Sequence, residues 1–190
     1  MIDFLALNAD KSAYMAGAAS IVSIVALFVF FAVGGVFGPI NDSASVFQFL
    51  FLIPIALALY RILAPHSRAL SLGATAVGIA AMLVFAVLQA LLVFGYVRFE
   101  QTLKPVLILS GIVGLWWLST SILSITRGAL PAGLAWVGVV AGVSSVLVLV
   151  GFWIGGQEHP LAAVGFLAGG VAIPVWAFWM GKFLAASHAP

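Results

Sequence analysis

The fold is decided by residues 70–97, which read LSLGATAVGIAAMLVFAVLQALLVFGYV and contain no Asp, Glu, Lys, Arg or His. An apolar helix needs roughly 20 residues to cross the hydrocarbon core of a bilayer, which is about 30 Å thick. This run is longer than that, and we therefore predict that it forms a transmembrane helix.

The composition of the whole chain extends this prediction. Of its 190 residues, 65% are hydrophobic and 6% are charged, whereas a soluble domain averages about 45–50% apolar and about 25% charged residues. Seven Lys and Arg with five Asp and Glu are too few to cover a water-facing surface. This balance excludes a soluble globule, a disordered chain and a nucleic-acid-binding protein, and it predicts an integral membrane protein.

Five further apolar runs are separated by segments rich in Gly, Pro and polar residues. One such segment, GPINDS at residues 38–43, predicts a turn. We predict an all-α, polytopic transmembrane bundle of six spans that forms a single domain over residues 1–190. The predicted spans cover residues 13–36, 44–60, 70–97, 105–125, 130–154 and 161–184.

The distribution of Lys and Arg predicts the orientation. Membrane proteins carry an excess of these residues in their cytoplasmic loops. With the N-terminus inside, the far side receives only Arg98 and Lys104, so we expect both termini in the cytoplasm. The cytoplasmic side then receives Lys11, Arg61, Arg68, Arg127 and Lys182.

The predicted spans hold no ionisable residue well inside the membrane. Such residues are costly in lipid and usually mark proton relays or ion paths, so a proton-coupled transporter is not expected. The deep amide Gln89 has two interpretations, an interhelical hydrogen bond or a contact with a ligand or pore. Pro54 and Pro174 are expected to break their spans and could contribute to the same path.

The predicted outer loops hold four side chains that can bind metals or polar headgroups. These are Asp42, Glu100, Glu158 and His159, and carboxylates with an imidazole suit a divalent cation. The alternative is that they face water at the helix ends. All three histidines, His66, His159 and His188, lie outside the spans, so haem bound between helices is not expected.

Four pairs of glycines have the spacing that lets transmembrane helices approach closely. We expect them to pack helices within the chain, or to contact another subunit. The pairs are Gly34/Gly38, Gly138/Gly142, Gly151/Gly155 and Gly165/Gly169.

Residues 124–142 read SITRGALPAGLAWVGVVAG, a short loop followed by Leu-Pro, Trp and a glycine-spaced helix. This segment resembles one shared by uncharacterised bacterial six-helix integral membrane proteins, which are grouped as a domain of unknown function. The resemblance covers the last third of the chain and, beyond it, the number of helices. Many of those proteins have an arginine after the proline, where this chain has Ala132. The resemblance implies a multi-pass protein of a bacterial inner membrane, and it assigns no catalytic residue.

The sequence is compatible with three functions. The first is a non-catalytic accessory or scaffold subunit of a larger bacterial membrane complex, with other membrane subunits and lipids as partners. The second is a transporter or channel for a small neutral or apolar solute. The third is a membrane enzyme that acts on a lipid or quinone through the outer polar residues. The absence of cysteine excludes covalent haem and iron–sulfur clusters, whereas a bound lipid, quinone or pigment is compatible with the sequence.

Overall fold

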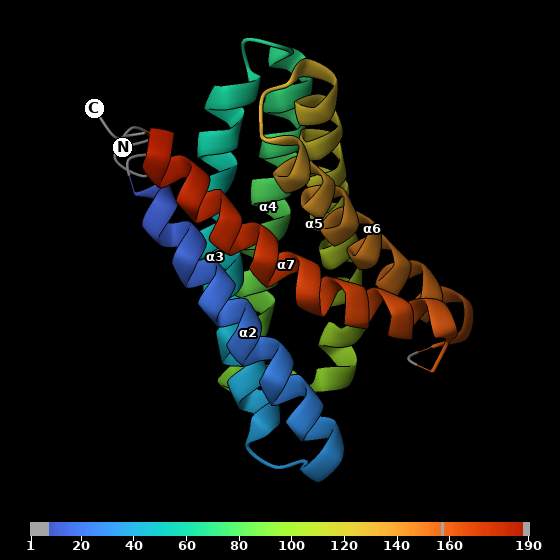
Figure 1. Cartoon of the computed structure of the whole chain (residues 1–190). Coiled ribbons are helices and arrows are strands. Elements are labelled where there is room, and N and C mark those ends of the chain that lie inside the picture. Colours follow the sequence, from blue (N-terminus) through green and yellow to red (C-terminus); the bar gives the residue numbers. More distant parts are fainter. Residues whose placement is uncertain (1–7, 157, 188–190) are drawn as a thin grey trace.

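The computed structural model describes residues 8–156 and 158–187, and in these ranges it contains six long helices and no strand (Figure 1). Each helix is long and apolar enough to cross a membrane. The predicted all-α fold with six spans is therefore confirmed, and the protein is a multi-pass membrane protein. The helices are α2 (Ala9–Val33), α3 (Phe37–Leu63), α4 (Arg68–Val93), α5 (Phe99–Arg127), α6 (Ala132–Gly155) and α7 (Pro160–Ser187).

The six helices form a closed ring. Each packs against its neighbours in the chain, and α7 returns to pack against α2. Within the described ranges, the remaining contact between helices is a small one across the ring, from α3 to α5. Because the ring is closed, all six helices face a common centre. We call the end with the connections after Val33, Val93 and Gly155 the Gly34 end, and the opposite one the Arg127 end.

Toward the Arg127 end the centre of the ring is solid. Trp116, Trp117 and Trp176 are all at least 98% buried and pack against one another, with ring centroids 5.5–6.1 Å apart. Trp176 meets the other two rings edge-on, which is a favoured geometry for aromatic pairs. Fully buried Met180 and Leu134 belong to the same core, so large side chains fill the centre of this half.

Glycines set how closely the helices approach. A Cβ added to Gly142 on α6 would lie 2.7 Å from the carbonyl oxygen of Gly114 on α5, and one added to Gly165 on α7 would lie 2.6 Å from that of Ser144 on α6. Gly138 packs against Trp176. The predicted glycine pairs of α6 and α7 therefore lie at contacts within this chain. The remaining members have these neighbours: Gly151 meets Ala162, Gly155 meets His159, and Gly169 meets Ser144.

The predicted turn at residues 38–43 is wrong. The chain reverses at Gly34 and Gly35, each with φ of 70°, and α3 already begins at Phe37. Two glycines supply the left-handed conformation at little steric cost, and Pro39 lies in the first helical turn, where an N–H has no partner to lose. Gly34 consequently belongs to a turn and does not form a helix-packing pair with Gly38, whose nearest neighbour is Phe30.

The expectation that Pro54 and Pro174 break their helices is also wrong. Both α3 and α7 run without interruption through these residues. A proline removes one backbone hydrogen bond, and in a membrane the neighbouring helices and small local adjustments compensate for it. The polar segment after Arg98 is helical as well, because the Gln101 side chain accepts a hydrogen bond of 2.8 Å from the Arg98 backbone and so stabilises the start of α5.

Replacement of Gly142 by Ala should destabilise the protein by about 1–3 kcal/mol, because the new Cβ would be forced against the backbone of α5. The matched control is Gly73→Ala on α4, where a Cβ would meet nothing within 4 Å. Thermal unfolding of the two purified variants in detergent measures the difference. Equal melting temperatures would contradict the close α5–α6 packing.

Candidate functional site

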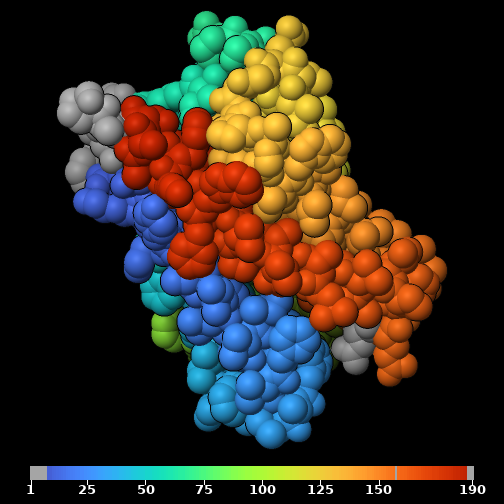
Figure 2. All heavy atoms as spheres, viewed as in Figure 1, coloured from blue at the N-terminus to red at the C-terminus, as the bar shows by residue number. Residues whose placement is uncertain are grey.

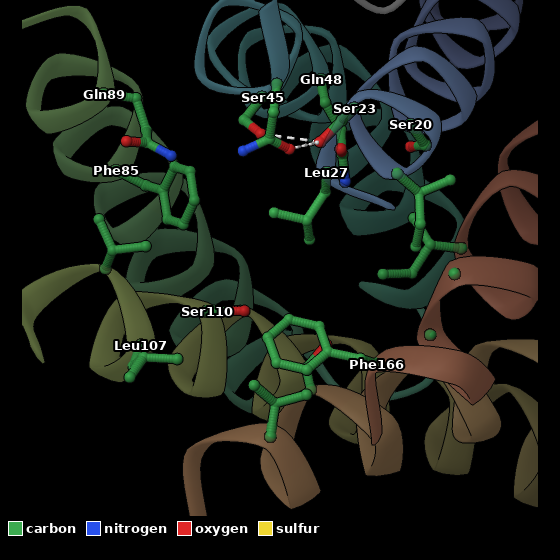
Figure 3. A pocket seen from close by; sticks show the side chains of 18 of the residues that line it. Ser20, Ser23, Leu27, Ser45, Gln48, Phe85, Gln89, Leu107, Ser110 and Phe166 are labelled. Carbon is green, nitrogen blue, oxygen red and sulfur yellow. Dashed lines mark hydrogen bonds between the residues drawn. The ribbon is translucent and has the colours of Figure 1, made fainter. Parts of the chain in front are cut away.

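A cavity of about 270 Å³ lies inside the ring, and all six helices contribute to its lining. Figure 3 shows side chains from several helices pointing into this common space. Its lining lies in the half toward the Gly34 end, and Trp117 of the buried tryptophan core forms part of it. The volume is close to the lower limit of the roughly 300–1,000 Å³ that is usual for small-molecule pockets.

Most of the cavity wall is apolar. Phe49 of α3 and Phe85 of α4 stack, with ring centroids 3.8 Å apart, and they form one flat side of it. Leu27, Leu107 and Phe166 line other sides (Figure 3). Such walls favour the apolar part of a ligand and exclude an ion that keeps its hydration shell.

The side formed by α2 and α3 is polar. Ser23 Oγ donates a hydrogen bond of 2.7 Å to Asn41 Oδ1 and lies 3.0 Å from Ser45 Oγ (Figure 3). Because a serine hydroxyl has one proton, Ser45 must be the donor to Ser23. The Asn41 amide then donates to Asp42 Oδ1 at 3.1 Å. The donors therefore follow one direction, from Ser45 through Ser23 and Asn41 to Asp42.

Gln89 of α4 supplies an amide that has an unused hydrogen-bonding atom. Its side chain is 94% buried, it lines the cavity, and its Oε1 accepts no hydrogen bond from the described part of the chain. A half-turn about the terminal bond presents either its oxygen or its nitrogen to the cavity. An unpaired buried polar atom costs about 1–3 kcal/mol, so a ligand that pairs with it gains binding energy.

Trp117 supplies a matching donor. Its indole is 99% buried and lines the cavity, and its Nε1–H finds no acceptor among residues 8–156 and 158–187. An indole N–H can only donate. The lining thus combines apolar side chains, two residues that each carry an unpaired buried polar atom, and the polar chain that ends at Asp42.

The predicted site residues separate into two groups. Gln89, Pro174 and Asp42 line the cavity, and Asp42 does so from the second turn of α3 and not from a loop. Glu100, Glu158 and His159 are not among the lining residues, and Glu100 and Glu158 are exposed. In the described ranges, no three His, Asp or Glu side chains lie close enough to hold a metal ion. The structure therefore does not assemble the outer polar residues into a metal site. Pro54 lies in α3 outside the cavity lining.

Several polar lining residues were not predicted as site residues. Among them, Asn41, Ser45 and Gln48 lie on one face of α3, at intervals of four and three residues, and Ser23 lies opposite them on α2. The spacing is the signal that could have revealed this face. The predicted turn at residues 38–43 separates Asn41 from Ser45 and Gln48, which fall in the predicted span 44–60, so the common face does not emerge from the prediction.

The comparisons with known proteins give no match. No family model, curated protein or solved structure is significantly similar to this chain.

Replacement of Ser23 by Ala should lower stability by about 1 kcal/mol, because it removes the hydrogen bond that joins α2 to α3 and leaves Asn41 Oδ1 without that donor. The control is Ser119→Ala, since the Ser119 hydroxyl bonds the carbonyl of Leu115 on its own helix. Denaturant unfolding in detergent compares the two variants. If Ser119→Ala lowers the stability as much as Ser23→Ala does, the hydrogen bond between α2 and α3 contributes no more than a bond within one helix.

Proposed function

We propose that this membrane protein is a transporter for a small, uncharged, amphipathic solute, and that the central cavity is its binding site. The observation that carries the proposal is a largely apolar cavity, lined by all six helices, whose lining includes the buried amide of Gln89 with its unpaired oxygen. Buried polar atoms are nearly always paired in proteins, and a solute hydroxyl would pair this one. The unpaired atoms of Ser71, Thr75, Trp116 and Trp176 lie outside the lining and have no part in this proposal.

The lining chemistry favours an uncharged solute. Among the described residues, no Lys, Arg or His lines the cavity, so an anion has no cationic partner. Asp42 is the ionisable residue of the lining, and it already accepts a hydrogen bond from Asn41. Hydroxyls and amides supply the other polar contacts, and these groups suit neutral donors and acceptors.

The solid tryptophan core favours a transporter over an open channel. It closes the Arg127 side of the cavity, so a solute could cross only after α5 and α7 move apart around Trp117 and Trp176. Given the Lys and Arg distribution, the cavity would lie in the half away from the cytoplasm. We propose an inner membrane as the location of the protein.

A non-catalytic accessory subunit of a larger membrane complex is the second candidate, and one observation favours it. Gly73, Ala76 and Ala80 lie on an exposed face of α4, and small residues allow another helix to approach closely. An enzyme acting on lipid or quinone has less support, because Glu100, Glu158 and His159 lie outside the cavity lining.

Extraction of the native membrane in mild detergent, followed by mass spectrometry, separates the two candidates. The accessory role requires stoichiometric co-migration with other membrane subunits, and Ala76→Leu and Ala80→Leu should then release this chain. A transporter that functions alone should migrate alone. If the unaltered protein co-migrates stoichiometrically with other membrane subunits and these variants do not, the accessory role is favoured.

A diazirine-bearing octanol tests solute binding directly. In liposomes it should label cavity residues of the unaltered protein, and unlabelled octanol should compete. Gln89→Met should weaken labelling about tenfold, since one hydrogen bond of about 1–1.5 kcal/mol is lost. The matched control is Val87→Met on the exposed face of the same helix, which should label as the unaltered protein does. Labelling confined to the outer surface of the bundle would contradict the proposal.

A further inference from the structure

We propose that the ligand enters the cavity sideways from the membrane, between the second half of α2 and the first half of α7. The ligand is then a membrane-dissolved, single-chain amphiphile with a hydroxyl-bearing, uncharged head, such as a monoacylglycerol or a long-chain alcohol. This inference rests on the proposed function, because it assigns the entrance and the ligand class of the same cavity.

The contacts between α2 and α7 are close near the Arg127 end. A Cβ added to Gly181 would lie 3.1 Å from a ring carbon of Tyr14, and one added to Gly17 would lie 3.0 Å from the ring of Phe178. Nearer the middle, the side chain of Ile24 packs on Gly170. From there the two helices separate toward Val33 and Pro160, as Figures 1 and 2 show for this face of the molecule.

Beyond Ile24, the side chains of both helices line the cavity. Leu27 and Phe31 do so from α2, and Phe166 does so from α7. Phe31 nevertheless has 66% of its surface exposed. A side chain that lines a cavity and is also largely exposed lies at an opening. Phe99, at the start of α5, meets the same criterion at the Gly34 end. The α2 span is the least buried of the six, so the opening at Phe31 lies beside a helix whose surface is mostly exposed.

The opening is apolar and faces the lipid. Ile24, Leu27, Phe31 and Phe166 form its edges, and Phe28 and Val25 beside them on α2 are more than half exposed. A hydrophilic solute gains nothing from such a passage. An acyl chain, by contrast, can remain between α2 and α7 while its head reaches the polar residues inside.

The head should carry a hydrogen-bond donor. Gln89 Oε1 has no donor among the described residues, and a hydroxyl can donate to it. A cavity of about 270 Å³ holds a small head with a few methylene groups, and the rest of the chain must extend through the opening. These demands select an alcohol-type amphiphile over a hydrocarbon.

Photolabelling with a monoacylglycerol that carries a diazirine in the middle of its acyl chain tests the entrance. In liposomes, the labelled residues of the unaltered protein should include Leu27, Phe31 or Phe166. The variant Leu27→Trp should reduce labelling by this probe about tenfold, because the larger ring fills the opening. Val25→Trp places the same ring on the lipid-facing side of α2 and should leave labelling unchanged.

The outcomes separate the entrance from the proposed function. If the octanol probe labels the cavity but the monoacylglycerol labels neither α2 nor α7 at the opening, the lateral entrance is wrong and the binding site stands. If neither probe labels cavity residues, the proposed function fails. Because the labelled positions are read in the unaltered protein, the test does not depend on whether Leu27→Trp folds.

Discussion

The structure depends on the contact by which α7 closes the ring against α2. Lipid tails are as apolar as leucine, so helices in a membrane associate through close packing and not through the hydrophobic effect. At this contact Gly17 receives the ring of Phe178 and Gly181 receives that of Tyr14. Without the closure, the polar side chains of α2 and α3 would face lipid, and the central cavity would lose its wall between α2 and α7.

The two halves of the ring differ because their side chains differ in size. Three tryptophans fill the centre near the Arg127 end. Toward the Gly34 end, serines and glycines take the corresponding places on α6 and α7, such as Ser144, Ser145 and Gly169. Both serine hydroxyls bond the carbonyl of Ala141 on their own helix, so they line the cavity without unpaired donors. These small residues therefore leave space in the half toward the Gly34 end, and the serine hydroxyls stay paired because they bond within their own helix.

The number and approximate position of the helices could be predicted from the sequence, because apolar length is a direct consequence of bilayer thickness. The glycine contacts of α6 and α7 could be predicted as well. The order of the helices around the ring could not, since lipid and protein interior are equally apolar and the helices show little difference between their faces. The polar face of α3 was missed for a local reason. Pro39 and Asn41 are typical turn residues, yet Gly34 and Gly35 form the turn and leave both within the helix.

Under the proposed function, the unpaired oxygen of Gln89 would make a largely apolar cavity selective. An apolar pocket distinguishes ligands by shape alone, and one methylene group changes binding by only about 1–3 kcal/mol. A buried polar atom that stays unpaired penalises every ligand without a partner for it. An alkane of suitable size would fill the same space but leave the Gln89 amide unpaired, whereas an alcohol would pair it. In the proposed entry path, Phe31 would border the tail, and the polar chain from Ser45 to Asp42 would face the head.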